Sequence, residues 1–431
     1  MTSYTESSEE SGSRMPSEIL TSYYDYPTHD QESWWRDTGP LFGRFLKGAG
    51  YDVHTQYQYL VFFIKNILPS LGPYPARWRS TITPTGLPIE YSLNFQKNSR
   101  PLLRIGFEPL SRFSGTAQDP YNKIATADLL NQLAKVQLHD FDTQLFNHFM
   151  NDFDLSRAET EALQKQGGIN GKSTVRSQTA FGFDLKGGRV SVKGYAFAGL
   201  KNRATGIPVG QLISDSVRKL EPQMHCWDSF SILNDYMEKS DGWNEYSFVS
   251  WDCVDIERSR LKLYGVHNAV TWEKVKEMWT LGGRIEEDAT IKAGLELLQH
   301  MWSLLRIDEG NRDYKGGFAA DNGGKTLPII WNYEINKGSP HPAPKFYFPV
   351  HGENDLQVSK SISEFFSHLG WDDHARQYPH LLRQIYPNQN ISLTERLQAW
   401  ISFAYHEHTG PYLSVYYYAA ERPPWGSDQV K

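Results

Sequence analysis

Apolar residues recur every three or four positions in several segments of the chain, which is the spacing of one face of a helix. The clearest segments predict helices near 28–45, from about 55 to 68, near 129–136 and over 288–305. Thr28 and Gln31 form a capping box at the start of the first segment, and Asp288 lies near the start of the last. We interpret the apolar stripes as faces that pack on a core.

Between these helices the pattern changes to an alternation of apolar and polar residues, which is typical of β-strands. The alternating runs come in pairs, and the turn Lys186-Gly187-Gly188 predicts that one pair is a hairpin. The pairs are 87–95 with 102–107, 178–185 with 189–197, 248–255 with 258–266, 329–335 with 345–350, and 397–405 with 412–418. Helices followed by two antiparallel strands thus repeat about five times. We therefore predict an α+β fold, in which about ten antiparallel strands close into one barrel ringed by helices.

Each predicted strand has an apolar row and a polar row, because successive side chains point to opposite faces. In the strand 87–95 the apolar row is Ile89, Tyr91, Leu93 and Phe95. The polar rows of six strands are Glu90, Ser92 and Asn94; Arg104, Gly106 and Glu108; Lys193 and Tyr195; Arg258, Arg260, Lys262 and Tyr264; Lys345 and Tyr347; and Tyr412, Ser414, Tyr416 and Tyr418. If helices cover the apolar rows, the polar rows fill a lumen that holds cations, tyrosines and one carboxylate. The alternative is a sheet whose polar face lies in water.

Composition narrows the classes of protein. The net charge of -6 over 431 residues argues against a nucleic-acid binder, and two cysteines are too few for a disulfide framework. No apolar run approaches the 18 residues of a membrane span, and the N-terminus has no apolar segment of a signal peptide. We expect a cytoplasmic protein with a disordered tail over 1–20 and a single domain over 21–431.

Three strands contain the same motif, a lysine followed two residues later by a tyrosine on the same face. The pairs are Lys193 with Tyr195, Lys262 with Tyr264, and Lys345 with Tyr347; Arg104 and Arg260 bring the predicted lumen cations to five. Like charges that lie so close are costly unless an anion joins them. A diphosphate would supply that negative charge and accept hydrogen bonds from arginine and lysine.

Aromatic faces stabilise cations, and phenol rings exclude water from a reactive intermediate. Tyr195, Tyr264, Tyr347 and Tyr416 are therefore candidates to shield an allyl cation as the diphosphate leaves. Glu90, on an inward row, can accept a hydrogen bond from an N–H nucleophile and act as a base; the alternative is a structural salt bridge. An apolar-ligand carrier would leave five cations unpaired. A metal-dependent prenyl transferase would need an aspartate-rich DDxxD motif, which we do not find.

The stretch Gly86-Leu87-Pro88-Ile89-Glu90-Tyr91-Ser92 and the later cation–tyrosine motifs resemble the fungal aromatic (indole) prenyltransferases, the dimethylallyltryptophan synthase family. The resemblance spans nearly the whole chain after about residue 20. It implies an αββα prenyltransferase barrel that transfers dimethylallyl from dimethylallyl diphosphate, its co-substrate, to an indole without a required cofactor or metal. It also implies that Glu90 contacts the indole N–H. Arg104, Lys193, Arg260, Lys262, Lys345 and Tyr347 would hold the diphosphate, although many members have Gln at the position of Lys345.

The segment Pro344 to Asp355 resembles the reverse prenyltransferases of tryptophan-containing cyclic dipeptides, which favours cyclo-L-Trp-L-Pro and attack at indole C2. Members that act on free tryptophan carry a Lys on the strand 178–185. Here the inward row is Gln178, Ala180 and Gly182, which leaves room for a diketopiperazine ring. Free tryptophan, another aromatic acceptor, and attack at C3 or N1 remain alternatives. We expect a monomer or homodimer that binds these small molecules, without nucleic acid or membrane.

Overall fold

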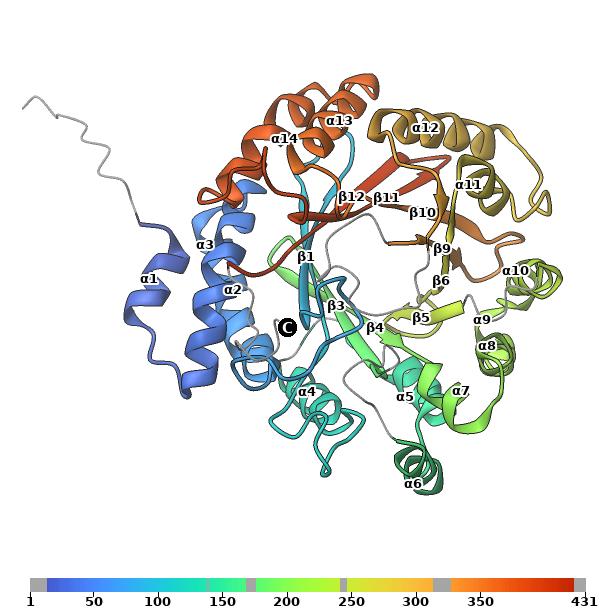
Figure 1. Cartoon of the computed structure of the whole chain (residues 1–431), viewed down its shortest axis with the longest axis horizontal. Helices are drawn as coiled ribbons and strands as arrows, with labels where there is room; N and C mark the ends of the chain where they lie inside the picture. The colour runs from blue at the N-terminus through green and yellow to red at the C-terminus, as the bar shows by residue number, and fades with distance from the viewer. Residues whose placement is uncertain are drawn as a thin grey trace, which may run out of the picture.

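The computed structural model describes residues 14–136, 138, 140–167, 176–240, 246–312 and 327–421. Its centre is a closed antiparallel barrel in which the strands follow one another as β1-β12-β11-β10-β9-β6-β5-β4-β3-β2 (Figure 1). The ten strands are β1 (Ile89–Phe95), β2 (Leu102–Phe107), β3 (Thr179–Lys186), β4 (Arg189–Ala196), β5 (Tyr246–Asp252), β6 (Leu261–His267), β9 (Ile329–Ile335), β10 (Ala343–Pro349), β11 (Gln398–His406) and β12 (Gly410–Tyr417). The five predicted strand pairs are five hairpins of this barrel, so the predicted fold class is confirmed.

The helices form an outer ring around the strands (Figure 1). Those before the barrel are α1 (Pro16–Tyr23), α2 (His29–Gly48) and α3 (Val53–Phe62). Between the hairpins lie α4 (Ile124–Lys135), α5 (Gln144–Phe153), α6 (Arg157–Lys165), α7 (Gly199–Thr205), α8 (Val209–Arg218), α9 (Glu221–Met224), α10 (Trp227–Lys239), α11 (Trp272–Trp279), α12 (Ala289–Leu305), α13 (Asp355–His368) and α14 (Asp372–Ile385). Two short strands, β7 (Ala269–Val270) and β8 (Gly310–Asn311), pair outside the barrel. No described helix is long and apolar enough to cross a membrane.

Local sequence signals explain where the predicted helices begin. The Thr28 side chain accepts a hydrogen bond from the Gln31 backbone N at 3.2 Å at the start of α2. Asp288 accepts one from Ile291 N at 2.9 Å at the start of α12. The segment after residue 55 differs from its prediction, because the α-helix ends at Phe62. A π-turn (Phe63–Ile67) and a 3-10 turn (Leu68–Ser70) continue the helical path. Pro69 fits at the start of the 3-10 turn, where no N–H donor is needed.

The first helix begins within residues 1–20, which were predicted to be a disordered tail. Helix α1 begins at Pro16, and the Glu18 carboxylate accepts a hydrogen bond from the Met15 backbone N at 2.8 Å. Ser17 is fully buried against α2, where a Cβ added to Gly43 would lie 2.3 Å from the Ser17 Oγ. Glycine at position 43 thus lets the two helices touch, and residues 16–20 are held in the fold. Residues 1–13 of the predicted tail lie outside the described residues.

The barrel separates two apolar clusters. The larger fills the layer between strands and helices and takes the outward rows, including Ile89, Tyr91, Leu93 and Phe95 of β1. The smaller lies inside the barrel and consists of Tyr264, Leu327, Tyr347, Ala399 and Trp400, with Tyr195, Phe248, Ile330 and Tyr416 packed on it. The apolar rows therefore face the helices as predicted. The alternative, a polar face in open water, is wrong because the sheet closes on itself.

Candidate functional site

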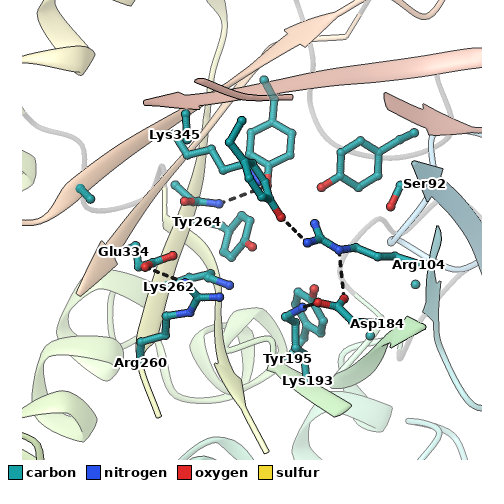
Figure 2. A pocket seen from close by; sticks show the side chains of 18 of the residues that line it. Ser92, Arg104, Asp184, Lys193, Tyr195, Arg260, Lys262, Tyr264, Glu334 and Lys345 are labelled. Carbon is teal, nitrogen blue, oxygen red and sulfur yellow. Dashed lines mark hydrogen bonds and ion pairs between the residues drawn. The ribbon is translucent and has the colours of Figure 1, made fainter. Parts of the chain in front are cut away.

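A cavity inside the barrel brings together the ten residues predicted to act on the indole, hold the diphosphate or shield the allyl cation. Its walls are the inward rows of the strands, so residues up to 326 positions apart in the chain meet there, as Glu90 and Tyr416 do. The predicted residues that line it are Glu90, Arg104, Lys193, Tyr195, Arg260, Lys262, Tyr264, Lys345, Tyr347 and Tyr416. Figure 2 shows the cations arranged around an open space.

Asp184 joins two of these cations from β3, which lies between their strands. Its Oδ1 lies 3.0 Å from Arg104 Nε, and its Oδ2 forms an ion pair with Lys193 Nζ (Figure 2). The strand register places Asp184 directly opposite Arg104. Burial disfavours the carboxylate, but Arg104 and Lys193 outweigh that effect and lower the pKa of Asp184. Arg104 also donates a hydrogen bond to the Tyr412 hydroxyl, so its guanidinium is held on two sides.

Arg260 is held in a similar way by two carboxylates. Its Nε lies 2.8 Å from Asp252 Oδ2, and its Nη1 lies 2.8 Å from Glu334 Oε1. Glu334 stands on β9, directly opposite Lys262 of β6. The guanidinium therefore bridges two carboxylates from neighbouring parts of the barrel, and its orientation toward the cavity is fixed before any ligand arrives.

Lys262 and Lys345 differ from the other three cations, because neither makes a direct ion pair among the described residues. Burial, and next the charge of Arg260, lower the pKa of Lys262 to about 8. Burial, and next the charge of Arg104, hold the pKa of Lys345 well below its usual range. The Lys345 ammonium lies over the rings of Tyr347 and Tyr412, 5.4 and 5.0 Å from their centroids. An anion that enters between these two lysines would supply the missing negative charge.

Glu90 reaches into the cavity across a glycine. It stands opposite Gly106 of β2, where an added Cβ would lie 2.8 Å from the Glu90 Oε1. Any larger residue at 106 would displace the carboxylate. Burial raises the pKa of Glu90 to about 8, which favours the protonated form at neutral pH. No described residue forms a salt bridge with Glu90, which removes the structural interpretation of this residue.

Aromatic rings form one side of the cavity. Centroid distances of 6.4, 6.3 and 5.8 Å connect Tyr195 to Tyr264, Tyr264 to Tyr347, and Tyr347 to Tyr416. Phe248 stacks on Tyr264 at 4.3 Å with 19° between the rings. Such a row of faces can stabilise a cation beside the anion site and can pack against a flat aromatic acceptor.

The family model described as tryptophan dimethylallyltransferase matches residues 30–380 of the chain. The chain belongs to this family. Echinulin prenyltransferase 1 of Aspergillus ruber is 91% identical over 417 residues, 97% of this chain and 100% of the relative. Deoxybrevianamide E synthase notF of an Aspergillus species is 51% identical, over 96% and 93% of the two chains.

Solved structures of the family have the same fold. The crystal structure of NotF with brevianamide F and DMSPP has a TM-score of 0.86 at 49% identity, covering 95% of this chain and 100% of NotF. AnaPT from Neosartorya fischeri has a TM-score of 0.84 at 32% identity, covering 94% and 98%. This prenyltransferase therefore has the prenyltransferase barrel that the sequence predicted. Dimethylallyl diphosphate is the co-substrate of the family, which is metal-independent.

Several residues of this prenyltransferase's cavity escaped the sequence prediction. The predicted lumen has a single carboxylate, which is wrong because Asp184 and Glu334 also line the cavity; Asn332 and His406 line it too and were not predicted. Asp184 lies two positions after Gly182 on the same inward row, and that parity was a usable signal. Arg258 is not in the lumen; it precedes β6 and pairs with Asp140 at 3.2 Å on the surface. Glu108 lies just past β2, where the side chains of Trp78, Ser80, Asn122 and Ser177 donate to it.

Proposed function

We propose that this enzyme transfers a dimethylallyl group from dimethylallyl diphosphate to the indole ring of a tryptophan-containing cyclic dipeptide, by reverse attachment at C2. The observation that carries the proposal is one cavity with two unlike walls. Five cations, two of which have no carboxylate partner among the described residues, form one wall at one end of the cavity; aromatic rings form the other wall, and Glu90 projects between them. A diphosphate ester with an apolar allyl group has the same division into a charged and an apolar part.

The diphosphate lies among Arg104, Lys193, Arg260, Lys262 and Lys345, and the Tyr347 hydroxyl donates to it. As the allylic C–O bond breaks, the electron pair stays on the leaving diphosphate, where the five cations stabilise it. Lys262 and Lys345 contribute most to this change, because they have no carboxylate partner among the described residues. Arg104, Lys193 and Arg260 are already oriented by Asp184, Asp252 and Glu334.

The allyl cation then lies against the faces of Tyr195, Tyr264, Tyr347 and Tyr416. Indole C2 attacks its tertiary end and forms the new C–C bond, and transfer of the C2 proton to the released diphosphate restores the aromatic ring. Glu90 as a carboxylate accepts a hydrogen bond from the indole N–H and so increases electron density on the ring. The acceptor N–H favours this ionised form, because a hydrogen bond donated to a carboxylate stabilises its charge.

Two relationships support a cyclic dipeptide as the acceptor. NotF, which is 49% identical, has been solved in complex with brevianamide F and DMSPP. The relative at 91% identity is named for echinulin and not for brevianamide. Experiment must therefore determine which amino acid is joined to tryptophan in the cyclic dipeptide that this enzyme accepts. Cyclo-L-Trp-L-Pro and cyclo-L-Trp-L-Ala are the two acceptors that we would compare.

The test offers both cyclic dipeptides and L-tryptophan, separately, to purified enzyme with dimethylallyl diphosphate and EDTA. We expect a dipeptide product that gains one C5H8 unit, with a quaternary carbon on indole C2 by NMR. Product from L-tryptophan alone would overturn the acceptor, and a bond to C3 or N1 would overturn the position of attack. Loss of activity with EDTA that Mg²⁺ restores would contradict the metal-independent mechanism.

A further inference from the structure

Gln178 directly precedes β3, and its side chain belongs to the inward row of that strand. Its backbone O accepts a hydrogen bond from Phe197 N at 2.9 Å, which continues the ladder of β3 and β4 beyond the pair Thr179–Ala196. Thr179 points outward, because its hydroxyl lies 2.6 Å from that of Thr126 on α4. Gly182 and Asp184, with the parity of Gln178, line the cavity. Gln178 therefore faces the lumen.

The strand register also places Gln178 at the aromatic end of the lumen. Asp184 lies opposite Arg104 and Gly182 opposite Lys193, at the level of the cations. Two steps further along the inward row of β3, past Ala180 opposite Tyr195, Gln178 lies opposite Phe197. The Phe197 ring is 4.9 Å from that of Phe248, which stacks on Tyr264. The ring of Phe197, on the strand opposite Gln178, thus continues the row of rings formed by Tyr264 and Phe248.

The Gln178 amide is buried without a partner. The residue is 4% exposed, and neither its Nε2 nor its Oε1 has a hydrogen-bond partner among the residues that the structure describes. An unsatisfied buried polar group costs about 1–3 kcal/mol, and such groups are uncommon in folded proteins. A ligand that supplied both a donor and an acceptor at this point would remove that cost.

A diketopiperazine ring has the complementary edge. Its amides are held cis by the ring, so an N–H and a C=O lie side by side on one edge. A primary carboxamide also has an N–H beside a C=O, and the two groups can form a pair of parallel hydrogen bonds. Free tryptophan has an ammonium and a carboxylate instead, and a neutral amide leaves both charges uncompensated.

We propose that Gln178 pairs with a cis amide of the acceptor's diketopiperazine ring and thereby selects cyclic dipeptides over free tryptophan. This inference rests on the proposed function. Gln178 binds the part of the acceptor that does not react, so its contribution is to acceptor affinity. The chemistry at the indole and the grip on the diphosphate do not involve it.

The test compares wild type with Gln178→Leu, which keeps the size of the side chain and removes both hydrogen-bonding groups. We expect the KM for the cyclic dipeptide to rise about 10–100-fold, while kcat and the KM for dimethylallyl diphosphate stay within about threefold. Thr179→Val is the matched control, because it removes a hydrogen bond from the helix-facing side of the same strand. It should leave the acceptor KM unchanged.

A modified acceptor makes the test independent of how well the variant folds. The cyclic dipeptide methylated on its tryptophan amide N lacks the donor, so wild type should discriminate against it and Gln178→Leu should discriminate much less. Equal discrimination by both enzymes, or an unchanged acceptor KM in Gln178→Leu, would overturn the inference while the proposed function stood. Failure of wild type to prenylate any cyclic dipeptide would overturn the proposed function, and the inference with it.

Discussion

The two walls of the cavity are built in different ways. In the cationic wall, Arg104, Lys193 and Arg260 are fixed by ion pairs that cross between strands. The aromatic wall has no ion pair among the described residues, and its rings touch at centroid distances from 4.3 to 6.4 Å. Ion pairs that fix the orientation of the cations suit the diphosphate, which is the same in every reaction. Contacts with ring faces depend little on orientation. This wall therefore suits acceptors that share an indole and differ in the rest of the molecule.

Glu90→Gln should have the largest effect, because Glu90 projects between the two walls and acts on the bond-forming step. We expect turnover to fall about 10²–10⁴-fold with little change in the KM for either substrate. Steady-state kinetics with a thermal unfolding curve would separate this loss from misfolding. Turnover within about threefold of wild type would remove Glu90 from the mechanism.

Asp184→Asn should disturb the cationic wall alone. Removing its charge leaves Arg104 and Lys193 in close repulsion without their shared partner. We expect the KM for dimethylallyl diphosphate to rise about 10–100-fold, with a smaller change in the acceptor KM. Asp152→Asn is the matched control, because Asp152 is also ion-paired with a lysine, Lys219, and has 19% exposure against 18% for Asp184. Equal effects of the two variants would indicate general destabilisation.

The pH dependence of kcat/KM should distinguish Lys262 from Glu90, because loss of the proton from the first lowers activity as the pH rises and loss of the proton from the second raises it. Lys262, with a pKa lowered to about 8, is charged below that pH, so kcat/KM for dimethylallyl diphosphate should fall about tenfold per unit well above it. Glu90, with a pKa raised to about 8, ionises in the free enzyme only as the pH rises toward that value, so its limb increases with pH. When kcat/KM of wild type is divided by kcat/KM of Glu90→Gln at each pH, the effect of substrate ionisation cancels. A ratio that does not rise between pH 6 and 8 would contradict the role of Glu90.

Substitutions of Tyr264 should have the smallest effects and should test whether the face or the hydroxyl matters. Tyr264→Phe keeps the face that packs between Phe248 and Tyr347, so we expect turnover within about threefold of wild type. Tyr264→Ala removes the face and should cost about 2–30-fold, which corresponds to 0.5–2 kcal/mol for one cation–π contact. Product analysis should also show more dimethylallyl alcohol from water attack in the alanine variant. Equal losses in both variants would assign the role to the hydroxyl.

The sequence by itself determined the strands, the hairpins and the inward rows, because the alternation of side chains along a strand is a local property. Those rows were enough to find Glu90, the five cations and the four tyrosines. The resemblance to a known family then supplied the chemistry that this combination of residues performs.

Only the tertiary structure decided which of these groups are neutralised. Asp184 meets Arg104, and Glu334 meets Arg260, through the pairing and register of strands from different hairpins. Register depends on packing between strands far apart in the chain, and no local pattern contains it. The folded barrel also buried the Gln178 amide, and it left Gln178, Lys262 and Lys345 without a hydrogen-bonding or carboxylate partner among the described residues. Charge balance inside a barrel is a property of the closed sheet, because each pair joins residues from different strands.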